Sequence, residues 1–265
     1  MHEFTSRYGA WALIAGASEG IGEAFAHALA GRGLRLIMLA RREHKLAATA
    51  AAITKQHGVE VVSLACDLAD PDLAARVQAG VGDREVGLLI YNAAYSRIGG
   101  FFEQSLEHKL RTIDVNCRGP IILSHVLGQA MLARGRGGIV LMGSLAGEQG
   151  SPRLATYAAS KAFDRILAES LWGELRERGV DVLACVAGAT RTPGFEAVAS
   201  TVKGPVMEPA AVVEEALARL GRGEPSMIPG WGNRVGARVL ARVPNRWRVR
   251  IMDLATRSGG GSRED

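Results

Sequence analysis

The stretch Ala15-Gly-Ala-Ser-Glu-Gly-Ile-Gly22 begins at the end of the apolar run Trp11–Ala15 and leads into a segment of helix-forming residues. Glycines at such a junction allow a tight turn and let the backbone come close to a phosphate group, which then binds at the start of the helix. The spacing is Gly-x-x-x-Gly-x-Gly rather than the commoner Gly-x-Gly-x-x-Gly. A glycine-rich loop alone can be a close-packed turn, but its position between the first strand and the first helix favours dinucleotide binding.

The rest of the chain alternates short apolar runs with longer segments of helical periodicity. The apolar runs have the length of strands and are nearly continuous, as expected where both faces of a parallel sheet are covered. The predicted strands are Trp11–Ala15, Arg35–Leu39, Glu60–Ala65, Gly87–Tyr91, Gly138–Met142 and Asp181–Val186, with a seventh at Ser226–Ile228. The predicted helices are Gly20–Arg32, Glu43–His57, Pro71–Gly80, Leu106–Ala133, Thr156–Arg178 and Pro209–Leu220. This alternation predicts an α/β fold, a single-domain Rossmann-type doubly wound parallel sheet of about seven strands flanked by helices.

The composition agrees with one large domain followed by a basic extension. The chain has 265 residues, of which 48% are hydrophobic, enough to bury a single large core. We expect the main domain over residues 1–230, a basic amphipathic C-terminal extension over 231–257 and a disordered tail over 258–265. Residues 231–265 carry eight arginines and three acidic residues, which accounts for the whole net charge of +5. Because this charge is local, it gives no support to nucleic-acid binding.

The cysteines and the N-terminal residues indicate a reducing compartment. Cys66, Cys117 and Cys185 each lie in or beside an apolar stretch and lack the spacing of metal ligands. We interpret them as buried, reduced thiols and expect no metal site. The first nine residues contain no apolar signal core, and no apolar run approaches membrane-spanning length. We therefore expect a cytoplasmic protein without a transmembrane segment.

The second predicted strand runs into Ala40-Arg41-Arg42, at a point where an acidic residue would hydrogen-bond the adenosine ribose of NAD. Two guanidinium groups instead suit a 2′-phosphate, because arginine binds phosphate through charge-assisted and often bidentate hydrogen bonds. The alternative is that both arginines merely start a surface helix, although positive charge is unfavourable at a helix N-terminus. The pair therefore predicts NADP(H) as the cofactor. After the third strand, Asp67, followed by Leu68, could accept a hydrogen bond from adenine or simply begin the next helix.

A tyrosine and a lysine stand four residues apart in Thr156-Tyr-Ala-Ala-Ser-Lys161, and Ser144 lies thirteen residues before the tyrosine. Residues at positions i and i+4 share one face of a helix. An ammonium group beside a phenol favours the phenolate, and a phenol that can give and take a proton suits the interconversion of a ketone and an alcohol. The spacing alone is common on helix surfaces, so its meaning depends on the other motifs.

The order of these and further motifs over about residues 10–230 resembles the short-chain dehydrogenase/reductase family. The positions that match its catalytic residues are Ser144, Tyr157, Lys161 and Asn116. The positions that match its cofactor contacts are Gly16, Ser18, Glu19, Gly20, Ile21, Gly22, Arg41, Arg42, Asp67, Leu68, Asn92, Ala93, Tyr157, Lys161, Gly188, Thr190 and Thr192. The resemblance implies that residues 1–230 form an NADP-binding catalytic domain.

The chain departs from the usual family pattern at three motif positions. Ala15 replaces a threonine, Ala94 replaces a glycine and Ala187 replaces a proline. These small substitutions bear on the backbone contacts to the cofactor rather than on the reaction. The segment Ile228–Arg234, together with Pro244, looks like a bacterial branch of ketone reductases.

The resemblance implies hydride transfer between NADP(H) and a carbonyl carbon. Tyr157 would act as general acid and base, Ser144 would orient the carbonyl oxygen, and Lys161 would stabilise the phenolate and hold the nicotinamide ribose. Asn116 would anchor a water molecule that links the lysine to solvent. Taken singly, each residue also has an ordinary structural explanation in a turn or on a helix. The alternative from another class is a protein that senses NADP without turnover.

The segment Pro193–Met207 resembles the substrate lid of the family. Its apolar side chains, and two phenylalanines after the fourth strand, suggest a hydrophobic substrate, but packing against the core explains them equally well. These residues are Phe195, Val198, Val202, Val206, Met207, Phe101 and Phe102.

Two further segments bear on assembly and on other partners. The long helices predicted at Leu106–Ala133 and Thr156–Arg178 resemble the subunit interface of the family, so we expect a homodimer or homotetramer. Arginines recur every four residues over Arg234–Arg242, which predicts a basic amphipathic helix that ends before Pro244. Such a helix could contact an anionic membrane surface, cover the substrate pocket or a neighbouring subunit, or be a solvated face.

Overall fold

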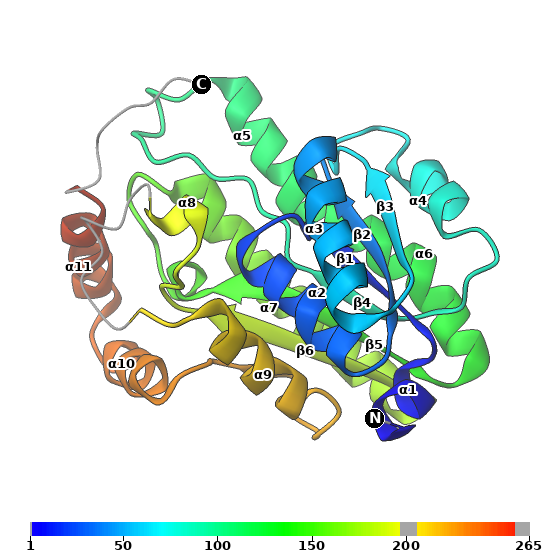
Figure 1. The fold of residues 1–265 in the computed structure, drawn as a ribbon. Helices are drawn as coiled ribbons and strands as arrows, with labels where there is room; N and C mark the ends of the chain where they lie inside the picture. Colours follow the sequence, from blue (N-terminus) through cyan, green and yellow to red (C-terminus); the bar gives the residue numbers. More distant parts are fainter. Residues whose placement is uncertain (1, 197–205, 258–265) are drawn as a thin grey trace.

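The computed structural model describes residues 2–196 and 206–257. Seven parallel strands form one sheet in the order β3-β2-β1-β4-β5-β6-β7 (Figure 1). Their bounds are β1 (Trp11–Ala15), β2 (Arg35–Ala40), β3 (Val61–Ala65), β4 (Val86–Tyr91), β5 (Gly137–Ser144), β6 (Val180–Ala187) and β7 (Ser226–Met227). The predicted doubly wound α/β sheet of seven strands is confirmed.

Helices cover both faces of the sheet, and each face has its own cluster of buried apolar side chains (Figure 1). The helices on one face are α1 (His2–Tyr8), α2 (Gly20–Gly31), α3 (Glu43–His57) and α9 (Pro209–Arg219). Those on the other face are α4 (Leu73–Val81), α6 (Gly119–Arg134) and α7 (Ala155–Leu175). Strand residues alternate between the two clusters because successive side chains of a strand point to opposite faces. In β1, for example, Ile14 belongs to the first cluster and Leu13 to the second.

The strand register brings the loops of the predicted site to one edge of the sheet. Ala15 at the end of β1 pairs with Leu39 in β2 and with Tyr91 in β4. Ser144 at the end of β5 pairs with Ala187 at the end of β6. All of these strands are parallel, so the loops that follow them leave the sheet on the same side.

One predicted helix, Leu106–Ala133, is interrupted. The structure has α5 (Leu106–Ile113), then a π-helical turn over Asp114–Arg118, then α6. Pro120 has no N–H and cannot donate to the carbonyl oxygen of Asn116, as an α-helix would require. Gly119 N donates instead to Asp114 O, five residues back. The other predicted elements are confirmed with ends shifted by a few residues.

The N-terminal helix α1 was not predicted, because a single seven-residue helix shows too little periodicity. Its Tyr8 is 2% exposed and donates from Oη to Asp181 Oδ2 at 2.8 Å. Arg7 makes a two-point contact with the same carboxylate, from Nε at 2.7 Å and from Nη2 at 2.8 Å. These contacts with β6 hold the helix against the sheet.

The C-terminal extension folds as two helices, α10 (Trp231–Ala241) and α11 (Asn245–Arg257), which lie on the side of the molecule that carries α8 (Pro193–Glu196) (Figure 1). The predicted basic helix corresponds to α10, and the second helix was not predicted. Thr256 Oγ1 lies 3.0 Å from the carbonyl oxygen of Pro152, so α11 contacts the loop before α7. The predicted disordered tail lies outside the described residues. Within the described ranges, no helix is long and apolar enough to cross a membrane.

The buried position of Tyr8 leads to a prediction about stability. Tyr8→Ala should lower the free energy of unfolding by about 3–5 kcal/mol, because it leaves a cavity under the sheet. Tyr8→Phe keeps the ring and removes only the hydrogen bond to Asp181, so its cost should be about 1 kcal/mol. Urea denaturation measures both values. Equal losses in the two variants would contradict the packing role of the ring.

Candidate active site

A cavity of about 1430 Å³ opens at the carboxyl edge of the sheet. Its walls come from the ends of β1, β2, β4, β5 and β6 and from the loops that follow them. The order of the strands reverses between β1 and β4, and open parallel sheets bind ligands in the crevice at such a point. The fold therefore surrounds one cavity with the glycine loop on one side and the start of α7 on the other.

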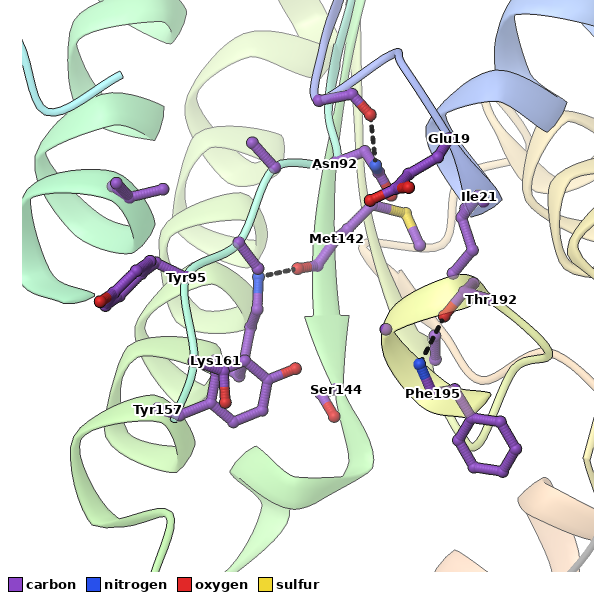
Figure 2. A pocket seen from close by; sticks show the side chains of 18 of the residues that line it. Glu19, Ile21, Asn92, Tyr95, Met142, Ser144, Tyr157, Lys161, Thr192 and Phe195 are labelled. Atoms are coloured by element: carbon purple, nitrogen blue, oxygen red, sulfur yellow. Dashed lines mark hydrogen bonds between the residues drawn. The ribbon is translucent and has the colours of Figure 1, made fainter. Parts of the chain in front are cut away.

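The glycine loop between β1 and α2 forms one end of this cavity. Gly16 and Gly20 adopt φ angles of +80° and +61°, which other residues rarely adopt. A Cβ atom at Gly22 would lie 1.9 Å from Gly16 O, and Asn92 Nδ2 donates to that same oxygen at 3.0 Å (Figure 2). The N-cap residue Glu19 makes no side-chain hydrogen bond to the helix. The first N–H groups of α2 therefore remain available to an anion such as a pyrophosphate.

The two arginines after β2 differ in their surroundings. Arg42 Nη2 lies 2.5 Å from Glu19 Oε1, and Lys45 contacts the other oxygen of that carboxylate. Partial burial of Glu19 works against its ionisation, but the hydrogen bonds from the two cations hold its pKa below the usual value. Arg41 also lines the cavity and has no ion pair within the part of the chain that the structure describes. Of the two guanidinium groups, Arg41 is the one free to meet a phosphate.

Asp67 begins the turn before α4 and also faces the cavity. Its Oδ1 accepts from Ala69 N at 3.0 Å, and its Oδ2 accepts from Arg111 Nη2 at 2.5 Å. Partial burial alone would raise the pKa of Asp67, but these hydrogen bonds hold it below its usual value. Asp67 thus stabilises the turn before α4, and its carboxylate has further lone pairs that can accept from an adenine amino group. Leu68, beside it, is buried and lines the same cavity.

Ser144, Tyr157 and Lys161 lie together on the opposite wall (Figure 2). Ser144 ends β5, and its Oγ accepts from Ala146 N at 3.2 Å, so the hydroxyl keeps its own hydrogen for another acceptor. Tyr157 lies in the first turn of α7, and its hydroxyl group points toward Ser144 (Figure 2). Lys161 Nζ lies 6.0 Å from the centre of the tyrosine ring. The structure thus brings the three predicted residues to one place.

The ammonium group of Lys161 is held from the core side. The residue is 3% exposed, and Nζ donates to Met142 O at 2.8 Å and to Asp164 Oδ2 at 2.9 Å. Burial is the largest single influence and lowers the pKa of Lys161, but the nearby charges, chiefly that of Asp164, and the hydrogen bond to Asp164 together outweigh it, so the pKa lies above its usual value. Asp164 was not predicted, although its spacing from Lys161 puts it in the buried stripe of α7. The buried residues of α7 are Ala158, Ser160, Lys161, Asp164, Ala168 and Leu175.

Asn116 lies behind this wall and is fully buried. Its Nδ2 donates to Tyr95 O at 3.0 Å and to Ser160 Oγ at 2.9 Å, and its Oδ1 accepts from Tyr95 N at 2.7 Å. Ser160 Oγ donates in turn to Tyr157 O at 2.7 Å. The amide therefore ties the loop after β4 to the first turn of α7. Its predicted role in a water relay to Lys161 stays a prediction.

The loop after β6 closes another side of the cavity with Gly188, Thr190 and Thr192. A Cβ atom at Gly188 would lie 2.7 Å from Asn233 Nδ2 of α10, so the loop packs tightly on the C-terminal extension. Thr192 Oγ1 accepts from Phe195 N at 3.1 Å (Figure 2), which fixes the start of α8. The sequence did not point to Asn233, because its role depends on a contact between distant segments.

The side chains expected to face a substrate divide into different groups. Phe195 lines the cavity. Phe101 and Phe102 do not, since they are 50% and 97% exposed and contact each other with ring centroids 5.3 Å apart. Among the described residues, this pair belongs to neither buried cluster, so the core-packing alternative does not apply to it, and contact with a substrate stays a prediction. Val198 and Val202 lie outside the described residues.

Residues 10–203 match the family described as short chain dehydrogenase, and this chain belongs to that family. A relative from Collinsella aerofaciens, named 7beta-hydroxysteroid dehydrogenase, is 31% identical over 236 residues, which cover 86% of this chain and 89% of the relative. The chain is therefore an oxidoreductase of a family that acts on hydroxyl groups with a nicotinamide cofactor.

Solved structures of similar proteins agree with this assignment. A structure from work on the stereoselectivity of 7beta-hydroxysteroid dehydrogenase has a TM-score of 0.86 at 30% identity. The match covers 94% of this chain and 98% of the chain in that structure. A short-chain dehydrogenase from Sphingobium yanoikuyae in complex with NADPH has a TM-score of 0.77 at 33% identity, with 88% and 96% covered. The open N–H groups of α2 and the close approach at Gly22 in this chain fit a dinucleotide.

The close approach at Gly22 yields a prediction about cofactor binding. Gly22→Ala should weaken NADPH binding at least about tenfold, which is ~1.4 kcal/mol, because the new methyl group would push the loop away from α2. Gly173→Ala is the matched control, since a Cβ atom there meets no atom of another described segment within 4 Å. Fluorescence titration measures both affinities, and circular dichroism checks the fold. Unchanged binding in Gly22→Ala would contradict the role of the loop.

Proposed function

We propose that this chain is an NADP(H)-dependent oxidoreductase that interconverts a ketone or aldehyde with an alcohol, with Tyr157 as general acid and base. The observation that carries this proposal is the common cavity of Ser144, Tyr157, Lys161 and the glycine loop. Its volume of about 1430 Å³ exceeds the ~300–1,000 Å³ of sites for single small ligands, so a cofactor and a substrate have room side by side.

Each residue has a task that follows from its position. The glycine loop and the first N–H groups of α2 would hold the pyrophosphate of NADP(H), and the nicotinamide would supply or accept the hydride at the carbonyl carbon. Tyr157 gives its proton to the carbonyl oxygen in reduction, and its phenolate takes the proton of the alcohol in oxidation. Ser144 donates its free hydrogen to the same oxygen, and Lys161 supplies positive charge that favours the phenolate.

The preference for NADP(H) over NAD(H) is supported by the guanidinium of Arg41, which has no ion pair with any residue that the structure describes. An acidic residue that would suit the ribose of NAD is not found at the end of β2, where the chain reads Ala40-Arg41-Arg42. Arg42 is paired with Glu19, so we assign the 2′-phosphate chiefly to Arg41. The similarity to a dehydrogenase solved with NADPH agrees with this assignment.

A hydrophobic substrate is supported by apolar side chains that line the cavity. Ile98, Leu154 and Phe195 are among them, and Leu154 lies three positions before Tyr157 in the sequence. The similarity to the Collinsella aerofaciens relative, which is named for a hydroxysteroid, also supports a hydrophobic substrate. A catalytically silent protein that senses NADP is the alternative, and the presence of Tyr157 and Lys161 argues against it.

We also propose a cytoplasmic homodimer or homotetramer built on the outer faces of α5, α6 and α7. This is supported by exposed apolar side chains on these helices, namely Leu106, Leu110, Ile113, Ile121 and Ile166. Residues 1–230 would form the catalytic domain and residues 231–257 the extension. The contact of α11 with the loop before α7 supports a role for the extension near the substrate, and peripheral membrane contact of its arginines is a further proposal.

Replacement of the phenol tests the proton transfer. Tyr157→Phe should lower kcat for carbonyl reduction by about 100-fold or more, because a general acid contributes roughly 10²–10⁴-fold. The affinity for NADPH should change little, since the ring stays in place. Steady-state kinetics and NADPH titration measure the two effects. Retention of most of the activity would rule out Tyr157 as the proton donor.

Replacement of the free arginine tests the cofactor preference. Arg41→Ala should raise the KM for NADPH about tenfold to a hundredfold, as expected for the loss of a charged hydrogen bond worth ~1.5–3 kcal/mol. The KM for NADH should stay nearly constant. Arg35→Ala, at the other end of β2, is the control and should leave both values unchanged. An equal loss for both cofactors would contradict the assignment.

A further inference from the structure

A carboxylate lies buried directly behind the candidate catalytic lysine. Asp164 is 1% exposed and Lys161 is 3% exposed, and Oδ2 lies 2.9 Å from Nζ. The two residues stand three positions apart on α7, so the helix itself keeps them on one face. In every other ion pair of the described residues, both side chains are at least 18% exposed. This pair is therefore the exception that needs an explanation.

The pair is poorly suited to a purely stabilising role. Asp164 Oδ1 is buried and has no hydrogen-bond partner among the described residues, which costs free energy. Burial raises the pKa of Asp164 above its usual value in spite of the lysine beside it. A well-packed apolar side chain of similar size often stabilises a protein at least as well as a buried ion pair. A buried charge with an unsatisfied oxygen beside a candidate catalytic group instead suggests a functional use.

We infer that Asp164 is a positioning residue that sets the charge felt by Tyr157. Its carboxylate holds Lys161 Nζ against Met142 O and cancels part of the positive charge that would otherwise favour the phenolate. The positive charge that Tyr157 experiences is therefore smaller, which favours the neutral phenol that acts as an acid in carbonyl reduction. This inference rests on the proposed function and adds the direction of reaction that the site favours near neutral pH.

The sign of the effect follows from the geometry. Lys161 Nζ lies 6.0 Å from the ring centre of Tyr157 and 2.9 Å from Asp164, so the carboxylate lies within about 9 Å of the ring. At an effective dielectric constant of ~20, removal of a negative charge at this distance should shift the midpoint of the pH profile by on the order of one unit. Tyrosine and lysine interact, so their first proton loss belongs to the pair. Removal of Asp164 should move the first proton loss of this pair to lower pH, whichever of the two residues holds the proton.

Other groups around the pair do not reverse this sign. Tyr91 of β4 and Cys117 of the π-helical turn interact with Asp164 from the neighbouring elements. Burial raises the pKa of Tyr91 well above its usual value and raises the pKa of Cys117 to about 11, so both stay neutral near pH 7. Met142 of β5 contributes only its carbonyl oxygen. The next charged residue on α7, Arg165, is paired with carboxylates on the outside of the helix.

Removal of the charge tests the inference. Asp164→Asn keeps the shape and an oxygen that can accept from Lys161, and Asp164→Leu removes the charge with an apolar side chain. In both variants the midpoint of the pH profile should fall by on the order of one unit. Alcohol oxidation with NADP should then rise near neutral pH. Carbonyl reduction should still be lost as the pH rises, but this loss should begin at a lower pH than in the parent. The tyrosinate absorbance of the NADP-bound protein, taken as the difference from the same protein with Tyr157→Phe, reports the shift without turnover.

Matched variants separate positioning from structure. Glu169→Gln removes a negative charge that pairs with Arg165 on the exposed side of the same helix, and its midpoint should equal that of the parent. Asp164→Glu keeps the charge and should also keep the parent midpoint. An unchanged midpoint in Asp164→Asn and Asp164→Leu, or a shift to higher pH, overturns the inference even if stability falls. If the parent reduces no carbonyl compound, the proposed function fails, while the absorbance titration still tests Asp164.

Discussion

The whole site depends on seven strands that run in one direction and end at one edge of the sheet. Ala15 pairs in register with Leu39 and Tyr91, and Ser144 pairs with Ala187. Helices bury both faces, so a strand cannot slip by one residue without turning its side chains to the wrong cluster. This constraint fixes where the glycine loop, the arginines after β2 and the serine after β5 leave the sheet, and it makes them share a cavity.

Helix α7 carries the candidate catalytic tyrosine and lysine to the edge of the sheet. Tyr157 faces the cavity from the first turn of the helix, while Lys161 and Asp164 lie one and two turns further on and are buried against the sheet. The fold thus places a charged pair where apolar packing would be the simpler solution. The electrostatic balance at the phenol is therefore set by buried groups that solvent and salt screen little.

Much of this architecture could be predicted because the signals are local. The glycine loop, the apolar strands and the Tyr157–Lys161 spacing are visible in short stretches of sequence. The π-helical turn before Pro120, the pairing of Arg42 with Glu19 and the outward turn of Phe102 depend on contacts or backbone detail that no single stretch contains. Asp164 is an intermediate case, since a charge three residues after Lys161 in a buried stripe was a readable signal.

The most direct test of the proposed activity is NADPH oxidation by the unmodified protein with a panel of hydrophobic ketones. The loss of NADPH absorbance measures the reaction. We expect steady turnover of at least one bulky ketone, with a much higher kcat/KM for NADPH than for NADH. NADPH binding without turnover of any carbonyl compound in the panel would contradict it and would favour a binding protein that kept the fold.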